Sequence, residues 1–300
     1  MTASDSPCDQ ATASFVTHRN LLFTVAYEML GSAADAEDVL QEVWLRWVDV
    51  DLQQVREQRA YLVKITTRLA LNRIRTSQRR KENYVGPWLP EPLLTTPDVA
   101  ENVELAESVS MAMMLVLETL SPIERAVFVL REVFEVNYAE IAAAVDKRPD
   151  AVRQIAHRSR QHVAARRPRR PVPSSQTRQT LEAGRRALET GDLQGFLDVL
   201  APDVVLITDG GGLTQAALHP INGADKVARF VMKGISRSGV TMTGEHSMIN
   251  GNPALILRVD GQVDGALAIR SSAGRITGAY YVRNPEKLRR LDAEISLTSR

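Results

Sequence analysis

The segment NYAEIAAAVDKRPDAVRQIAHRSRQHV, residues 137–163, decides how the middle of this chain folds. It predicts a short alanine-rich helix over 138–145, then a turn of about four residues, then a basic amphipathic helix that begins near Pro149. Asp150 adds a negative charge to the first turn of that second helix, where the helix dipole favours it. This arrangement is the helix-turn-helix pattern, whose second helix enters the major groove of DNA.

Helical periodicity divides the second helix into two faces. At roughly 100° per residue, an apolar side collects Val152, Ile155, Ala156, Ser159 and Val163. The polar remainder, with the turn before it, supplies the candidate DNA-binding residues Lys147, Arg148, Arg153, Gln154, His157, Arg158 and Arg160. The amide of Gln154 suits a base edge, while the later arginines suit phosphates. The alternative is an ordinary solvated helix face.

Local charge supports the DNA interpretation although the whole chain is nearly neutral. The formal net charge is +1, yet nine Lys or Arg stand against one acid between Lys147 and Arg170. Phosphate contact depends on this local density rather than on the total.

The segment 31–47 predicts an amphipathic helix with an acidic outer arc. Its apolar side is expected to be buried, which leaves Asp38, Gln41, Glu42 and Leu45 outward. Such a face fits docking on a protein partner, or else simple solvation.

The segment 59–81 predicts a helix with a different outer face. An aromatic, three cations and an amide recur every three or four residues, at Tyr61, Lys64, Arg68, Asn72 and Arg75. Side chains of these types bind unstacked bases and the backbone of single-stranded nucleic acid. Arg79 and Arg80 extend the positive charge. A solvated basic face is the alternative here too.

Together these segments resemble the extracytoplasmic-function sigma factors of bacterial RNA polymerase. GSAADAEDVLQEVWLRW and RAYLVKITTRLALNRIRTSQRR resemble their region 2, and the segment 120–163 resembles their region 4. The resemblance implies that the acidic face docks on the polymerase clamp. It implies that the Tyr61–Arg75 stripe meets the melted −10 element of promoter DNA and that the second helix of the helix-turn-helix reads the −35 element.

The last third of the sequence has the pattern of an α+β domain. Two helices broken at Gly191 and the strand VVLITD come first, and short β-branched runs separated by Gly and Asn follow from Val240 onward. We therefore predict two all-α sigma domains followed by an α+β domain. The expected boundaries are region 2 at 12–84, a linker at 85–105, region 4 at 106–167, a second linker at 168–176, and the α+β domain at 177–292.

Three short motifs resemble a subgroup of these sigma factors that carries a C-terminal SnoaL-like domain, a cone of the NTF2-like fold. They are WLPEP at 88–92, DGGG at 209–212 and NPEKL at 284–288. The resemblance implies that this domain regulates the sigma domains in place of a separate anti-sigma factor. The expected regulatory contact joins Trp88, Leu89 and Pro90 to Asp209, Gly210, Gly211 and Gly212.

An alternative function is a SnoaL-type enzyme, or a small-molecule-sensing domain, fused to a DNA-binding module. Asp209, His219 and His246 are the acid–base candidates, but their spacing is not diagnostic of a reaction. We expect no catalytic residues, no metal ligands and no cofactor. The partners expected are core RNA polymerase and promoter DNA, with a small-molecule ligand of the C-terminal domain left open. The single cysteine, Cys8, and the lack of a long apolar run fit a cytoplasmic protein that uses no membrane.

Overall fold

The computed structural model describes residues 7–96, 99, 102–166, 172–238, 242–291 and 294–298. The chain divides into two compact units, and each is described by itself. The helical unit comprises Met1–Glu82, Val116–Arg167 and Ser296–Arg300, and the sheet unit comprises Asn83–Leu115 and Pro168–Ile295.

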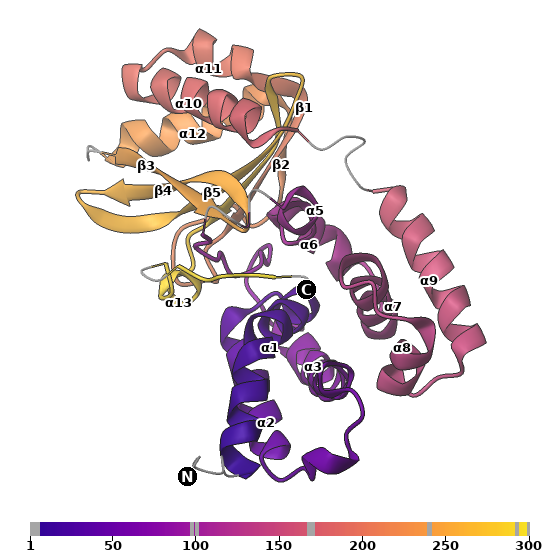
Figure 1. Ribbon diagram of the computed structural model, residues 1–300. Coiled ribbons are helices and arrows are strands. Elements are labelled where there is room, and N and C mark those ends of the chain that lie inside the picture. Colours follow the sequence, from indigo (N-terminus) through magenta and orange to yellow (C-terminus); the bar gives the residue numbers. More distant parts are fainter. Residues whose placement is uncertain are drawn as a thin grey trace. The chain divides into compact units, whose positions relative to one another are not determined.

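Three helices build the first part of the helical unit (Figure 1). They are α1 (Pro7–Leu30), α2 (Ala33–Trp47) and α3 (Gln58–Glu82), with a short 3₁₀ turn at Leu52–Gln54 before α3. Ser32 caps α2 by accepting a hydrogen bond from the Asp35 amide. The Trp47 side chain is fully buried and donates to the carbonyl of Ala11, so the indole nitrogen keeps a partner inside the core.

The second part of the helical unit contains the helix-turn-helix. Its elements are α6 (Met111–Glu118), of which the last three residues belong to this unit, α7 (Pro122–Phe128), a π-helical turn (Val129–Val133), α8 (Tyr138–Val145) and α9 (Pro149–Ala164). Asp146 takes a left-handed conformation with φ of 54° and ends α8. The buried side of α9 consists of Val152, Ile155, Ala156, Ser159 and Val163. The expected apolar side is confirmed.

The sheet unit is an α+β domain, as the sequence predicts. Its helices are α5 (Val103–Ser108), α10 (Ser174–Thr190), α11 (Leu193–Val199), α12 (Ala224–Ser238) and α13 (Pro285–Leu288). Its strands are β1 (Leu200–Asp209), β2 (Ile221–Asn222), β3 (Met242–Ile249), β4 (Asn252–Val259), β5 (Gln262–Ser272) and β6 (Arg275–Val282). They form one sheet in the order β2-β1-β6-β5-β4-β3, in which only the β1–β6 pair is parallel. This organisation agrees with the NTF2-like fold that the resemblance implied.

Both faces of this sheet are covered by the unit's own chain. Helices α10, α11 and α12 pack on one side, around a core that includes Leu181, Phe196 and Val227. The other core includes Leu89 from the segment before region 4 and Met111 of α6, packed with Ile249, Tyr280 and Val282. The proline-rich segment 84–96 is therefore more than a tether, because it supplies apolar cover for the sheet.

Candidate nucleic-acid interface and buried aspartate site

Helix α9 and the turn before it present the candidate −35 residues to solvent. All seven residues expected to bind DNA are exposed: Lys147, Arg148, Arg153, Gln154, His157, Arg158 and Arg160. Arg153 forms an ion pair with Asp150 and lies 5.7 Å from the centre of the Tyr138 ring. Arg160 lies 3.7 Å from a carboxylate oxygen of Glu132. These exposed pairs are weak, so they constrain the two arginines only slightly.

The residues of the candidate −10 stripe on α3 differ in exposure and in the contacts that they make. Asn72 and Arg75 are exposed, whereas Tyr61 is partly buried with its ring centre 5.8 Å from that of Trp47. Arg68 donates to the backbone carbonyls of α8, at 2.9 Å to Ala143 and 3.3 Å to Ala144. The Arg68 contact could not be read from helical periodicity. The expectations for Arg79 and Arg80 concern side chains that lie outside the described part of the structure.

Helix α2 exposes the candidate docking residues Asp38, Gln41, Glu42 and Leu45. Two of them have partners within the chain. Arg73 of α3 binds the carboxylates of both Asp35 and Asp38, and Arg46 lies 2.6 Å from Glu42. Hydrogen bonds to Asp35 and Asp38, together with their negative charge, outweigh partial burial and raise the pKa of Arg73. Asp38 thus also fastens α2 to α3.

A buried aspartate organises the sheet unit. Asp209 ends β1 with its side chain fully buried. One carboxylate oxygen accepts hydrogen bonds from the Tyr84 hydroxyl at 2.6 Å and from the Gly211 amide at 3.1 Å. The other accepts from the Leu89 amide at 2.8 Å and from the Lys287 ammonium at 2.7 Å. The structure therefore brings Leu89 of WLPEP, Asp209 of DGGG and Lys287 of NPEKL together.

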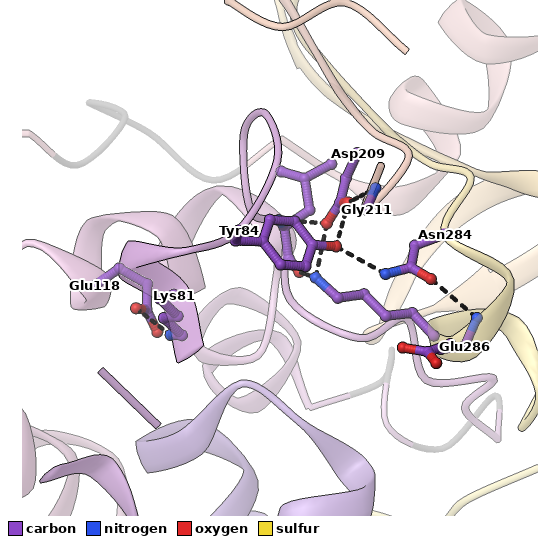
Figure 2. Close-up of polar contacts among 9 residues, drawn as sticks. Lys81, Tyr84, Glu118, Asp209, Gly211, Asn284 and Glu286 are labelled. Atoms are coloured by element: carbon purple, nitrogen blue, oxygen red, sulfur yellow. Dashed lines mark hydrogen bonds and ion pairs between the residues drawn. The ribbon is translucent and has the colours of Figure 1, made fainter. Parts of the chain in front are cut away.

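Tyr84 and Asn284 complete this aspartate cluster, as Figure 2 shows. The Asn284 amide donates to the Tyr84 oxygen at 2.8 Å, and its carbonyl accepts from the Glu286 amide at 2.9 Å. Burial and the hydrogen bond to Asp209 raise the pKa of Tyr84, so the phenol stays protonated and keeps donating. Sequence reasoning assigned no role to Tyr84, Asn284 or Lys287. The NPEKL motif was the available signal for the last two.

The DGGG turn depends on glycine at a crowded position. Gly211 has φ of 61°, and a Cβ atom there would lie 2.3 Å from the side-chain nitrogen of Asn284. A side chain would meet both backbone strain and a collision. Only glycine lets the turn approach Asn284 this closely.

A second contact holds the same segment to the sheet. Asn250, at the tip of the β3–β4 hairpin, is fully buried and accepts from the Leu93 amide at 3.0 Å. Its side-chain nitrogen donates to the Val109 carbonyl at 2.9 Å. Thr95 hydrogen-bonds the carbonyl of Met248, also in this hairpin. The segment between the two sigma regions is thus fastened at two places.

The acid–base candidates of the alternative function do not converge. Asp209 is buried with four donors, whereas His219 is exposed. His246 lies on β3 with its ring nitrogen 2.8 Å from Glu182 of α10. Among the described helices, none combines the length and the hydropathy needed to cross a membrane.

Comparisons with known proteins agree with this arrangement. Residues 15–80 match the Sigma-70 region 2 family, and residues 110–163 match the Sigma-70 region 4 family. The chain is 35% identical over 292 residues to the ECF RNA polymerase sigma factor SigJ of Mycobacterium tuberculosis, covering 92% of each chain. It is 30% identical over 290 residues to the probable ECF RNA polymerase sigma factor SigI of the same species, covering 96% of this chain and 98% of the relative.

The similarity extends to three dimensions. The crystal structure of SigJ from M. tuberculosis superposes with a TM-score of 0.76 and 31% identity, covering 92% of this chain and 98% of SigJ. The match includes the sheet unit as well as both sigma regions, because it spans nearly the whole of each chain. The chain therefore belongs to the extracytoplasmic-function family of RNA polymerase sigma factors.

Proposed function

We propose that this sigma factor binds core RNA polymerase through α2, reads the −35 element with α9 and meets the melted −10 element with α3. The similarity to SigJ over nearly the full length carries this proposal. The exposure of the seven candidate residues, in α9 and the turn before it, supports the assignment to −35 DNA. The protein acts where the polymerase is, in the cytoplasm, and does no chemistry of its own. Run-off transcription with core polymerase and a promoter library tests this. Failure of the full-length chain to direct any specific initiation would remove the proposal.

The sheet unit modulates the sigma domains within the same chain. The Asp209 cluster supports this role because it binds the segment that joins region 2 to region 4. The conformation of that segment sets how far apart the two DNA-binding regions can lie. Small-molecule sensing is the competing role, and substitutions confined to His219 that reproduce the regulatory effect would favour it.

The first expected result concerns the base and phosphate contacts of α9. Arg153→Ala and Gln154→Ala are each expected to cost about 1–3 kcal/mol at particular base pairs. Arg166→Ala should weaken binding evenly across sequences and flatten the salt dependence, as a phosphate contact does. Binding of each variant to a set of single-base-pair promoter changes, at several salt concentrations, measures both. If all three variants behave alike, the assignment of Arg153 and Gln154 to base contacts and of Arg166 to a phosphate contact is wrong.

The docking face gives the next prediction. Glu42→Lys combined with Leu45→Ala should lower the affinity for core polymerase about tenfold or more, since both side chains are exposed on α2. Asp49→Lys, an exposed acid just beyond α2, is the matched control and should bind core normally. Circular dichroism should show unchanged helix content in both variants. Normal core binding by the α2 variant would mean that this face is only solvated.

The DGGG turn provides a test of modulation by the sheet unit. Gly211→Ala should alter promoter activity strongly, because the new methyl group collides with Asn284 and displaces the turn. Gly191→Ala is the matched control, since φ is 71° there but no atom lies within 4 Å of the added Cβ. Backbone strain of about 1 kcal/mol is common to both. Transcription assays that respond equally to both changes would attribute the effect to strain rather than to the Asp209 cluster.

A further inference from the structure

The ring of Tyr138 lies beside the arginine that is expected to contact a base pair of the −35 element. Tyr138 is the first residue of α8 and is partly buried. Two guanidinium groups lie over its ring, that of Arg131 at 4.8 Å from the ring centre and that of Arg153 at 5.7 Å. A cation within about 6 Å of the centre is attracted to the negative face of an aromatic ring. The ring therefore attracts both arginines.

The position of the Tyr138 ring is set by its neighbours in region 4. Asn137 caps α8 by accepting a hydrogen bond from the Glu140 amide at 2.9 Å, which fixes the backbone where the helix begins. Arg131, in the π-helical turn before α8, donates to the carbonyl of Val136 at 3.1 Å. Because this hydrogen bond anchors Arg131 to the backbone just before Tyr138, its attraction to the ring favours one orientation of the tyrosine side chain.

Arg153 needs a fixed orientation if it is to read a base. Its side chain is 57% exposed, and immobilising such a long side chain on DNA costs conformational entropy. Asp150, one turn earlier on α9, pairs with the nitrogen Nη1. Within the described part of the structure, this leaves the edge formed by Nε and Nη2, which matches the two acceptors of a guanine in the major groove. The Tyr138 ring and Asp150 together restrict the group before DNA arrives.

We propose that Tyr138 is a positioning residue for −35 recognition, an aromatic platform that holds Arg153 ready for a guanine and contacts no base itself. The inference rests on the proposed assignment of α9 to the −35 element. The attraction comes from the face of the ring, so a phenylalanine would serve as well as the tyrosine. A direct phosphate contact would instead need the hydroxyl, because helix α8 of a helix-turn-helix also crosses the DNA backbone.

A double-mutant cycle tests the platform in the holoenzyme, assembled from core polymerase and the full chain. The variants are Tyr138→Phe, Tyr138→Leu, Arg153→Ala, and Tyr138→Leu combined with Arg153→Ala. The probe is a duplex that the wild-type holoenzyme selects from a library randomised in the −35 region, together with its single-base-pair variants.

Tyr138→Leu should weaken binding to the selected duplex about three- to fivefold, whereas Tyr138→Phe should change it less than about 1.5-fold. The discrimination lost should concern the same base pair that Arg153→Ala affects. In the Arg153→Ala background, Tyr138→Leu should have an effect of less than about 1.5-fold, because the group that the ring positions is absent.

Three outcomes would overturn the inference. Equal losses from the Phe and Leu variants would assign a phosphate contact to the hydroxyl. A loss from Tyr138→Leu that persists without Arg153, or that is spread evenly over all base pairs, would show a general structural effect. Circular dichroism checks folding, and Tyr138→Met carries the same cycle if the Leu variant unfolds.

A measurement without DNA separates the platform from the proposed function. In the free full chain with labelled arginine, the ring shifts the NMR signals of the Arg153 side chain. Tyr138→Leu should move these signals to the positions of a solvated arginine, and Tyr138→Phe should leave them in place. Signals unchanged by Tyr138→Leu would overturn the platform. If Arg153→Ala leaves −35 binding intact, the proposed base contact fails, and the NMR signals still decide whether the ring holds the guanidinium.

Discussion

Replacing Asp209 with alanine is expected to destabilise the sheet unit by about 3–5 kcal/mol, the cost of breaking a buried ion pair from one side. The change removes the acceptor of four hydrogen bonds and leaves the Lys287 ammonium without its carboxylate, although that side chain is only 12% exposed. The buried amide of Leu89 loses its acceptor as well. Urea unfolding of the full chain, followed by fluorescence and circular dichroism, measures the loss.

Two further variants test whether the destabilisation comes from breaking the buried ion pair rather than from removing any carboxylate. Glu182→Ala removes a partly exposed carboxylate that pairs with Arg185 of α10 and His246 of β3, and it should cost less than about 1 kcal/mol. Asp209→Ala combined with Lys287→Met should be less destabilising than Asp209→Ala alone, because no uncompensated charge then remains. If the double variant loses as much stability as the two single variants, Asp209→Ala and Lys287→Met, lose in sum, the ion-pair account is wrong.

Glu118→Ala is expected to produce the largest loss in the helical unit, about 3 kcal/mol, near the lower end for a buried ion pair because Glu118 keeps some exposure. Its carboxylate binds Lys81 of α3 at 2.5 Å and also Arg125 of α7. Arg125 is almost completely buried and donates to the Glu28 carbonyl of α1 at 2.8 Å. Removal of Glu118 leaves two poorly solvated cations near each other. Figure 2 shows the Lys81–Glu118 pair.

We also expect the stability that Glu118→Ala loses to depend on pH. Burial alone would raise the pKa of Glu118, but Arg125 and Lys81 outweigh it and hold the pKa below its ordinary value of 4.5. A lowered pKa in the folded state means that the stabilisation is present above pH 4.5 and is lost as the pH falls through the lowered value. Urea unfolding at neutral and acidic pH should therefore show the difference between wild type and Glu118→Ala shrinking in acid. Glu37→Ala, which breaks the more exposed pair with Arg19, is the control and should cost less than about 1 kcal/mol.

The sequence by itself determined the features that depend on local periodicity and on backbone chemistry. The buried side of α9 follows from its 3.6-residue repeat, and Pro149 marks its start because proline needs no partner for a missing amide hydrogen. The alternation of short strands and Gly or Asn turns indicated the α+β domain before any contact was known. Both sigma regions were recognisable for the same reason, since each is built from helices with a strong pattern.

Tertiary structure alone decided which distant residues meet. The prolines of 84–96 exclude a helix, but only the need to cover an apolar sheet face buries Leu89 and Leu93. Asp209 meets Tyr84 and Lys287 across 125 and 78 residues, and no local pattern encodes such a pairing. Arg68 looks like a solvated cation on a helical wheel, yet it caps a helix 75 residues away. The physical reason is that a buried carboxylate and an unpaired helix end each require partners, and the packed fold determines which side chains are within reach.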